Sequence, residues 1–118
     1  MSVNVAPDSL SASWLASRLG EEPGRIEAMR RAGELIAFRP EGAWEHYYPV
    51  WQFDDEWRPL PSIPRIVRAA RRAGLSENRL YAVLNARLGR LADRRRLADL
   101  LREGREDHVL EAVRSARS

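Results

Sequence analysis

The sequence predicts a mainly α-helical protein with a small β-hairpin, built as an N-terminal winged helix-turn-helix and a C-terminal bundle of short helices. Apolar residues recur at helical spacing along most of the 118 residues. One segment, residues 35–48, departs from this pattern because it combines an apolar run, a turn and an aromatic stretch. Three prolines within residues 59–64 favour an extended connector. We therefore expect two domains, residues 8–57 and 58–118.

The beginning of the chain is typical of two short helices joined by a tight turn. Apolar residues at helical spacing predict a helix from Leu10 to Leu19, capped by Ser9 or Ser11 and ended by Gly20. Pro23 is tolerated in a first helical turn, so a second helix is expected from there to Gly33. This arrangement is the sequence pattern of a helix-turn-helix.

A hairpin is expected directly after these helices. The apolar run 35–38 precedes the turn Pro40-Glu41-Gly42, and the aromatic-rich stretch 44–48 follows it. A hairpin in this position is a wing, which lies along the DNA backbone or minor groove while the second helix enters the major groove.

The second half is expected to hold four short helices with brief connections, which together make a small bundle. The first runs from Pro64 to Ala73 with Arg65, Arg68, Arg71 and Arg72 outward, and Ser76 caps the second. Asp93 opens the third, which carries Leu97, Leu100 and Leu101 and ends at Gly104, and the last begins near Glu106.

Composition excludes several kinds of chemistry. The chain has no cysteine, so disulfides, thiol nucleophiles and Cys-ligated metals are excluded. His46 and His108 each lack a second ligand at a suitable spacing, and the acidic run 54–56 is typical of a surface loop. We therefore expect no enzymatic activity, no metal and no cofactor. With neither a signal peptide nor a membrane span in the sequence, the expected location is the cytoplasm.

Charge is distributed unevenly, and all 20 basic residues are arginine. Residues 1–60 hold 6 arginines and 10 acidic residues, whereas residues 61–118 hold 14 arginines and 7 acidic residues. The sequence pI near 10.1 therefore reflects the second half. The prediction of DNA binding rests on the helix-turn-helix pattern rather than on overall basicity.

Candidate DNA contacts lie on the second helix and in the wing. A helical wheel anchored by Ile26 and Met29 places Glu27, Ala28 and Arg31 outward, with arginines flanking them. Arginine reaches guanine edges or phosphates, although exposed arginines are also common on solvated faces. The predicted DNA-binding residues are Arg25, Arg30, Arg31, Arg39 and His46.

Six aromatic residues lie between residues 44 and 57. They are compatible with a base-stacking platform, but core packing is the favoured interpretation because each ring buries a large apolar area. Trp51 and Phe53 are expected to bridge the two domains.

Several short motifs resemble known families. Residues 15–20 and 32–38 resemble excisionase-like and MerR-like winged-helix domains, and residues 48–53 are similar to the segment that joins such a domain to a helical one. The second domain resembles the toxin-binding domain of Xre/MbcA/ParS-like antitoxins, through residues 88–89, 100–104 and 109–112. Arg90 and Ala92-Asp93 depart from the usual pattern of that family, and Glu22 departs from that of the first.

The resemblance implies an antitoxin that inhibits a toxin, of the RES-domain or ADP-ribosyltransferase-like kind, and represses its own operon. We expect a homodimer on a two-fold operator with half-sites about 34–36 Å apart. The alternatives are a stand-alone regulator or excisionase-type factor, and a protein-interaction module without DNA binding. The outward arginines of the second half also suit phosphates or a solvated surface; those expected to face a protein partner are Arg94, Arg102, Arg105, Arg114 and Arg117.

Overall fold

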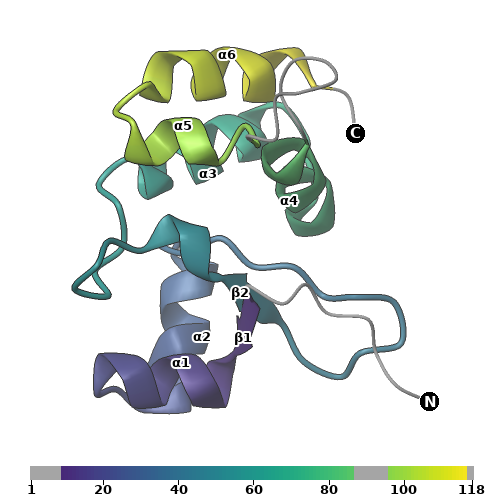
Figure 1. The fold of residues 1–118 in the computed structure, drawn as a ribbon. Helices are drawn as coiled ribbons and strands as arrows, with labels where there is room; N and C mark the ends of the chain where they lie inside the picture. The colour runs from purple at the N-terminus through teal and green to yellow at the C-terminus, as the bar shows by residue number, and fades with distance from the viewer. Residues whose placement is uncertain (1–8, 87–95, 117–118) are drawn as a thin grey trace.

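The computed structural model describes residues 9–86 and 96–116. The order of the elements is β1 (Ser9–Ser11), α1 (Ala12–Leu19), α2 (Pro23–Arg31), β2 (Tyr47–Pro49), the 3-10 helix η1 (Val50–Gln52), α3 (Ile63–Arg72), α4 (Glu77–Asn85), α5 (Asp99–Arg102) and α6 (Glu106–Ser115). Helices α1 and α2 and the two strands form one end of the molecule, and α3–α6 form the other (Figure 1). The predicted fold class, mainly α with a small antiparallel β element, is confirmed.

The antiparallel sheet pairs strands that are far apart in the sequence. β1 pairs with β2 in the register Ser9–Pro49, Leu10–Tyr48 and Ser11–Tyr47. Of the predicted hairpin, one isolated bridge forms, between Phe38 and Tyr47, and the segment between them makes the wing. No sequence pattern indicated that a strand before α1 would pair with β2, and in the structure the short strand β1 does so.

The helix ends follow the expected capping chemistry in most places. The Ser11 hydroxyl accepts a hydrogen bond from the Trp14 N–H, so α1 begins at Ala12 rather than at Leu10. Gly20 ends α1 with a φ of 69°, which favours glycine. The Ser76 hydroxyl caps α4 by accepting from the Arg79 N–H.

The third helix of the second half differs from the prediction. Asp93 lies outside the described residues, and residues 96–98 are not helical, so α5 begins only at Asp99. The backbone N–H groups of Leu97 and Ala98 donate to the carbonyls of Ala86 and Leu84, at the end of α4. These long-range hydrogen bonds replace the local helical ones that the apolar spacing predicted.

Two hydrophobic clusters fill the molecule, and residues 35–37 and 51–53 each contribute to both. Leu35 and Ala37 pack into the cluster of α1 and α2, whereas Ile36 packs into the cluster of α3–α6. This alternation is that of an extended chain, whose successive side chains point to opposite sides. Trp51 and Phe53 are divided in the same way, Trp51 in the second cluster and Phe53 in the first.

The side chain of Gln52 is fully buried between these clusters and pairs with the backbone of Ile36. Its Oε1 accepts from the Ile36 N–H at 2.7 Å, and its Nε2 donates to the Ile36 carbonyl at 2.7 Å. A further bond from Nε2 reaches the Pro49 carbonyl at 3.0 Å. The Gln52 amide thus supplies the two hydrogen bonds that a neighbouring strand would supply in a sheet. Because the backbone groups of Ile36 are already paired in this way, the hairpin does not extend to Ile36.

The Gln52→Ala variant should lose about 2–4 kcal/mol of unfolding free energy, because three buried backbone groups, the N–H and C=O of Ile36 and the C=O of Pro49, lose a partner. Asn78→Ala is a matched control, because the Asn78 amide pairs with both backbone groups of Arg39 in the same way but in an exposed position. We expect the control to lose about 1 kcal/mol or less, since water replaces the lost bonds. Urea denaturation followed by circular dichroism measures both, and equal losses would contradict the assigned role of burial.

Candidate nucleic-acid interface

The orientation of α2 is set by contacts at both of its ends. Pro23 begins the helix, and Ile26 anchors it with a fully buried side chain. At the other end, Nη2 of Arg71 on α3 donates to the carbonyl of Arg31 at 3.1 Å and reaches that of Arg30 at 3.5 Å. A cation at a helix C-terminus satisfies carbonyls that have no partner within the helix.

Gly33 allows α2 and α3 to approach closely. Its φ is 81°, and a Cβ placed there would lie 3.1 Å from Nη1 of Arg71 and 3.5 Å from a methyl group of Val67. A larger residue would strain the backbone and displace the Arg71 guanidinium from the end of α2. The second helix of the motif is therefore held by the second half of the chain.

The outward face of α2 carries arginines separated by a small residue. Arg25, Ala28 and Arg31 are exposed and recur every three residues, so they share one face. Neither Arg25 nor Arg31 makes a side-chain hydrogen bond or ion pair with the described part of the chain. Glu27, which the helical wheel placed at the centre of this face, is instead turned to the side of the helix.

Glu27 belongs to an ion-pair network that joins α2 to the wing and to α4. Its Oε2 lies 2.9 Å from Nη2 of Arg30, and its Oε1 accepts from the Tyr48 hydroxyl at 3.0 Å. Nη1 of Arg30 also donates to both carboxylate oxygens of Glu77, at 3.2 Å each. Nε2 of His46 lies 3.3 Å from Oε1 of Glu77.

This network separates the predicted DNA-binding residues into two groups. Arg30, with 14% of its side chain exposed, and His46, with 20%, engage Glu77 within the molecule. Arg25 and Arg31 remain on the outer face. The pairing follows from burial, since a partly buried guanidinium needs carboxylate partners to offset the loss of water.

The network also shifts the acidity of its members. Burial raises the pKa of the Glu27 carboxyl, but the hydrogen bonds from Arg30 and Tyr48 outweigh it and leave that pKa below its ordinary value. Burial opposes the charge of Arg30, yet its two carboxylate partners raise its pKa. The pKa of the Tyr48 phenol is raised by burial and then by the charge of Glu27. At neutral pH the network therefore contains an ionised Glu27 and a neutral Tyr48.

The wing is anchored on α4. The backbone N–H of Arg39 donates to Oδ1 of Asn78 at 2.7 Å, and Nδ2 of Asn78 donates back to the Arg39 carbonyl at 2.8 Å. The ring of Phe38 stacks on Tyr81 with centroids 3.8 Å apart. Arg39 itself is exposed and lines a hollow of about 580 Å³ between the wing and α4.

Trp44 corrects the expectation that the aromatic residues pack in the core. Its side chain is 98% exposed near the end of the wing, whereas Tyr48, Trp51 and Phe53 are buried as expected. The turn that Pro40 and Gly42 make carries Trp44 away from both clusters. An exposed tryptophan has no packing role and is free to contact a ligand.

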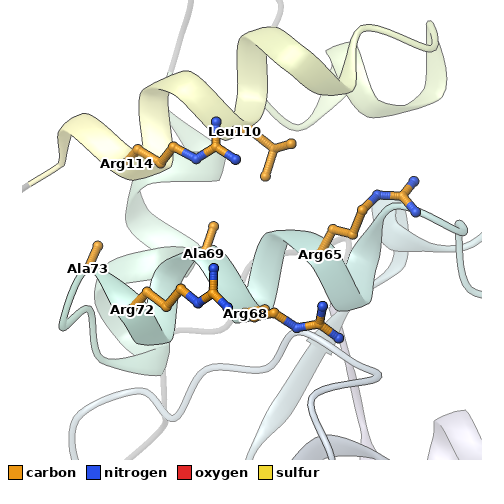
Figure 2. Close-up of a pocket in the computed structure, with 7 residues that line it drawn as sticks. All are labelled: Arg65, Arg68, Ala69, Arg72, Ala73, Leu110 and Arg114. Atoms are coloured by element: carbon orange, nitrogen blue, oxygen red, sulfur yellow. The ribbon is translucent and has the colours of Figure 1, made fainter.

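The residues expected to face a protein partner are dispersed. Nη2 of Arg102 donates to the Phe53 carbonyl at 2.8 Å and contacts Asp55 at 3.2 Å, so it fastens the loop that follows η1 to α5. Arg105 is exposed beside His108, with Nη2 to Nε2 at 3.4 Å. Arg114 lines a groove between α3 and α6 (Figure 2). Arg94 and Arg117 lie outside the described residues.

No sequence pattern indicated Glu77 and Asn78, the residues of α4 that contact α2 and the wing. Their partners are 47 and 39 positions away in the chain, so no local pattern indicates the contact. In the sequence, Glu77 is an acidic residue in the first turn of a helix, and acidic residues are common there without any further role.

The described residues contain no group of three metal-ligating side chains, and none of their helices is both long and apolar enough to cross a membrane. No protein-family model and no curated protein sequence matches the chain. Among solved structures, the fold is similar to the "NMR structure of Rv2175c", with a TM-score of 0.79 and 18% sequence identity over 94% of this chain and 83% of that one. At this level of identity, the likeness establishes a shared fold.

Replacing Glu27 with Gln should lower the unfolding free energy at about pH 7, and this loss should shrink towards about pH 3. The pKa of Glu27 is lower in the folded chain than in the unfolded one. Its contribution is therefore complete above the unfolded value of about 4.3 and is lost as the pH falls through the folded value. Urea denaturation across this range is the measurement. Glu41→Gln, at an exposed position of the wing, is the control, and a loss in Glu27→Gln that is independent of pH would contradict the network.

Proposed function

We propose that the protein binds double-stranded DNA through the outer face of α2 and through the wing, and that it regulates transcription as a homodimer in the cytoplasm. The observation that carries this proposal is the row Arg25, Ala28 and Arg31 on a helix whose other faces are all engaged. Two free guanidinium groups flank a residue small enough to let the helix backbone approach the base edges.

The outer face of α2 carries two arginines although the first half of the chain has a net negative charge, and this local positive charge supports the proposal. Glu27 is neutralised by Arg30 and lies beside the outer face rather than on it. Arginine presents a planar fork of donors that suits both guanine edges and phosphates. The fixed position of α2 against α3 also lowers the entropic cost of binding, because the helix is ordered before DNA arrives.

The wing provides a second contact beside α2. Arg39 is exposed at its base and Trp44 near its end, while Asn78 and Tyr81 hold its start in place. A cation and an aromatic ring on such a loop suit the sugar-phosphate backbone next to the groove that the helix enters.

Arg25→Ala and Arg31→Ala should each weaken binding to a specific duplex by about 1–3 kcal/mol if the arginine contacts a base. The probe is a labelled duplex from the region upstream of the coding sequence, measured by fluorescence anisotropy at several salt concentrations. Arg58→Ala is the matched control, since the Arg58 side chain is exposed just before the connector and pairs only with Glu56 in the described chain. Absence of binding at low salt would refute the proposed function, and unchanged affinity in both variants would refute the assignment to α2.

Toxin inhibition is a second candidate function, supported by exposed arginines at the start of α6 and in its last turn. Arg105 precedes α6, Arg114 lies near its C-terminal end, and both are on the surface of the second half. An antitoxin of this kind would block a RES-domain or ADP-ribosyltransferase-like enzyme with its C-terminal helices. Co-expression with such an enzyme encoded beside it should restore growth, and the double variant Arg105→Glu/Arg114→Glu should restore less. Growth arrest that persists with the unmodified protein would exclude that enzyme as its partner.

A further inference from the structure

A groove of about 400 Å³ lies between α3 and α6, on the surface of the second half. Figure 2 shows arginines from both helices along it, with small and apolar side chains between them. Its lining residues are Arg65, Arg68, Ala69, Arg72, Ala73, Leu110 and Arg114. None of these lining residues is acidic.

Three of the four arginines are available to a ligand. Arg65 pairs with Glu106 at the N-terminal end of α6, with Nη2 2.6 Å from Oε1. Arg68, Arg72 and Arg114 have no hydrogen bond or ion pair with the described part of the chain. Three guanidinium groups that stay charged at any physiological pH repel one another across one groove, and an anion placed between them removes that repulsion.

Helix α3 links the groove to the C-terminal end of α2. Arg71 precedes Arg72 on α3, and its guanidinium caps α2 at the Arg31 carbonyl. Arg72 is the next residue of α3, and because successive residues of a helix point in different directions, its side chain faces α6 rather than α2. Helix α3 thus contacts α2 through Arg71 and faces the groove and α6 through Arg72.

We infer that the groove between α3 and α6 binds the phosphate backbone of the same DNA duplex that α2 contacts. This inference rests on the proposed function and extends the DNA footprint into the second half of the protein. The molecule measures 37 × 33 × 29 Å, and one turn of B-DNA is about 34 Å long. Because no dimension of the molecule exceeds 37 Å, the groove lies within about one helical turn of α2.

The lining of the groove favours phosphates over an acidic protein segment. Its apolar part consists of two alanines and Leu110, which offers little area to hold a peptide side chain. Guanidinium forks match phosphate oxygens in pairs, and phosphates spaced along a backbone suit cations spaced along two helices. An acidic segment of a partner is the competing occupant that the experiment separates.

The test compares two duplexes with the full-length protein. One ends at the edge of the α2 site on the side of the groove, and the other continues the same sequence on that side for about one further helical turn. The unmodified protein should bind the longer duplex more tightly and with a steeper dependence on salt, because more phosphates are neutralised. Arg72→Ala/Arg114→Ala should lose that advantage, and its salt slope on the longer duplex should fall by about two. Its affinity for the shorter duplex should not change.

Arg58→Ala/Arg105→Ala is the control, since it removes two positive charges from exposed positions outside the groove. The inference is overturned if the groove variant binds the longer duplex with unchanged affinity and salt slope, or if both double variants lose affinity equally. Loss of binding to a polyglutamate probe with DNA binding intact would also overturn it, in favour of an acidic protein partner. If the unmodified protein binds neither duplex at low salt, the proposed function fails with it, which distinguishes the two failures.

Discussion

The pairing of the buried Gln52 amide with the backbone of Ile36 is the constraint on which the rest of the structure depends. Ile36 must run extended so that its neighbours enter one hydrophobic cluster while its own side chain enters the other. A chain in this position has backbone N–H and C=O groups that water cannot reach, and Gln52 satisfies both. Because Trp51 and Phe53 flank Gln52, the same interaction places an aromatic ring in each cluster.

Once this segment is fixed, the other contacts between the halves can form at defined positions. The wing starts at Phe38, directly after the paired segment, and stacks on α4 through Tyr81. Arg71 and Glu77 then meet α2 from α3 and α4. The outer face of α2 is therefore presented by residues of the second half as much as by α1, and the surface proposed to bind DNA is a property of the whole chain.

The sequence predicts local features of this fold well, because their causes are local. Ser11 and Ser76 cap helices by bonding backbone N–H groups three residues away, and the helical spacing of apolar residues places Ile66 and Val67 inward. The extent of the hairpin strands was harder to predict, because the side chain of Gln52 takes the place of a neighbouring strand. Residues 96–98 likewise bond to the end of α4, which apolar spacing does not reveal.

The candidate site was predictable in part for the same reason. A helical wheel places Arg31 outward correctly, because exposure on a short helix follows from its periodicity. It cannot show that Glu27 turns towards Tyr48 or that Arg30 meets Glu77, since those partners belong to distant segments. The exposure of Trp44 also depends on the path of the wing, whereas composition favours burial of such a residue.

Residues 35–37 and 51–53 supply side chains to both hydrophobic clusters, and this limits how the chain can be cut into fragments or fused to other domains. A fragment ending at the connector would expose Ile36 and Trp51 to water, and a fragment beginning there would leave gaps where those side chains pack. The two halves are thus joined by a connector, but neither packs completely without the other. Replacing either half by an unrelated module would therefore disturb the packing of the half that is kept.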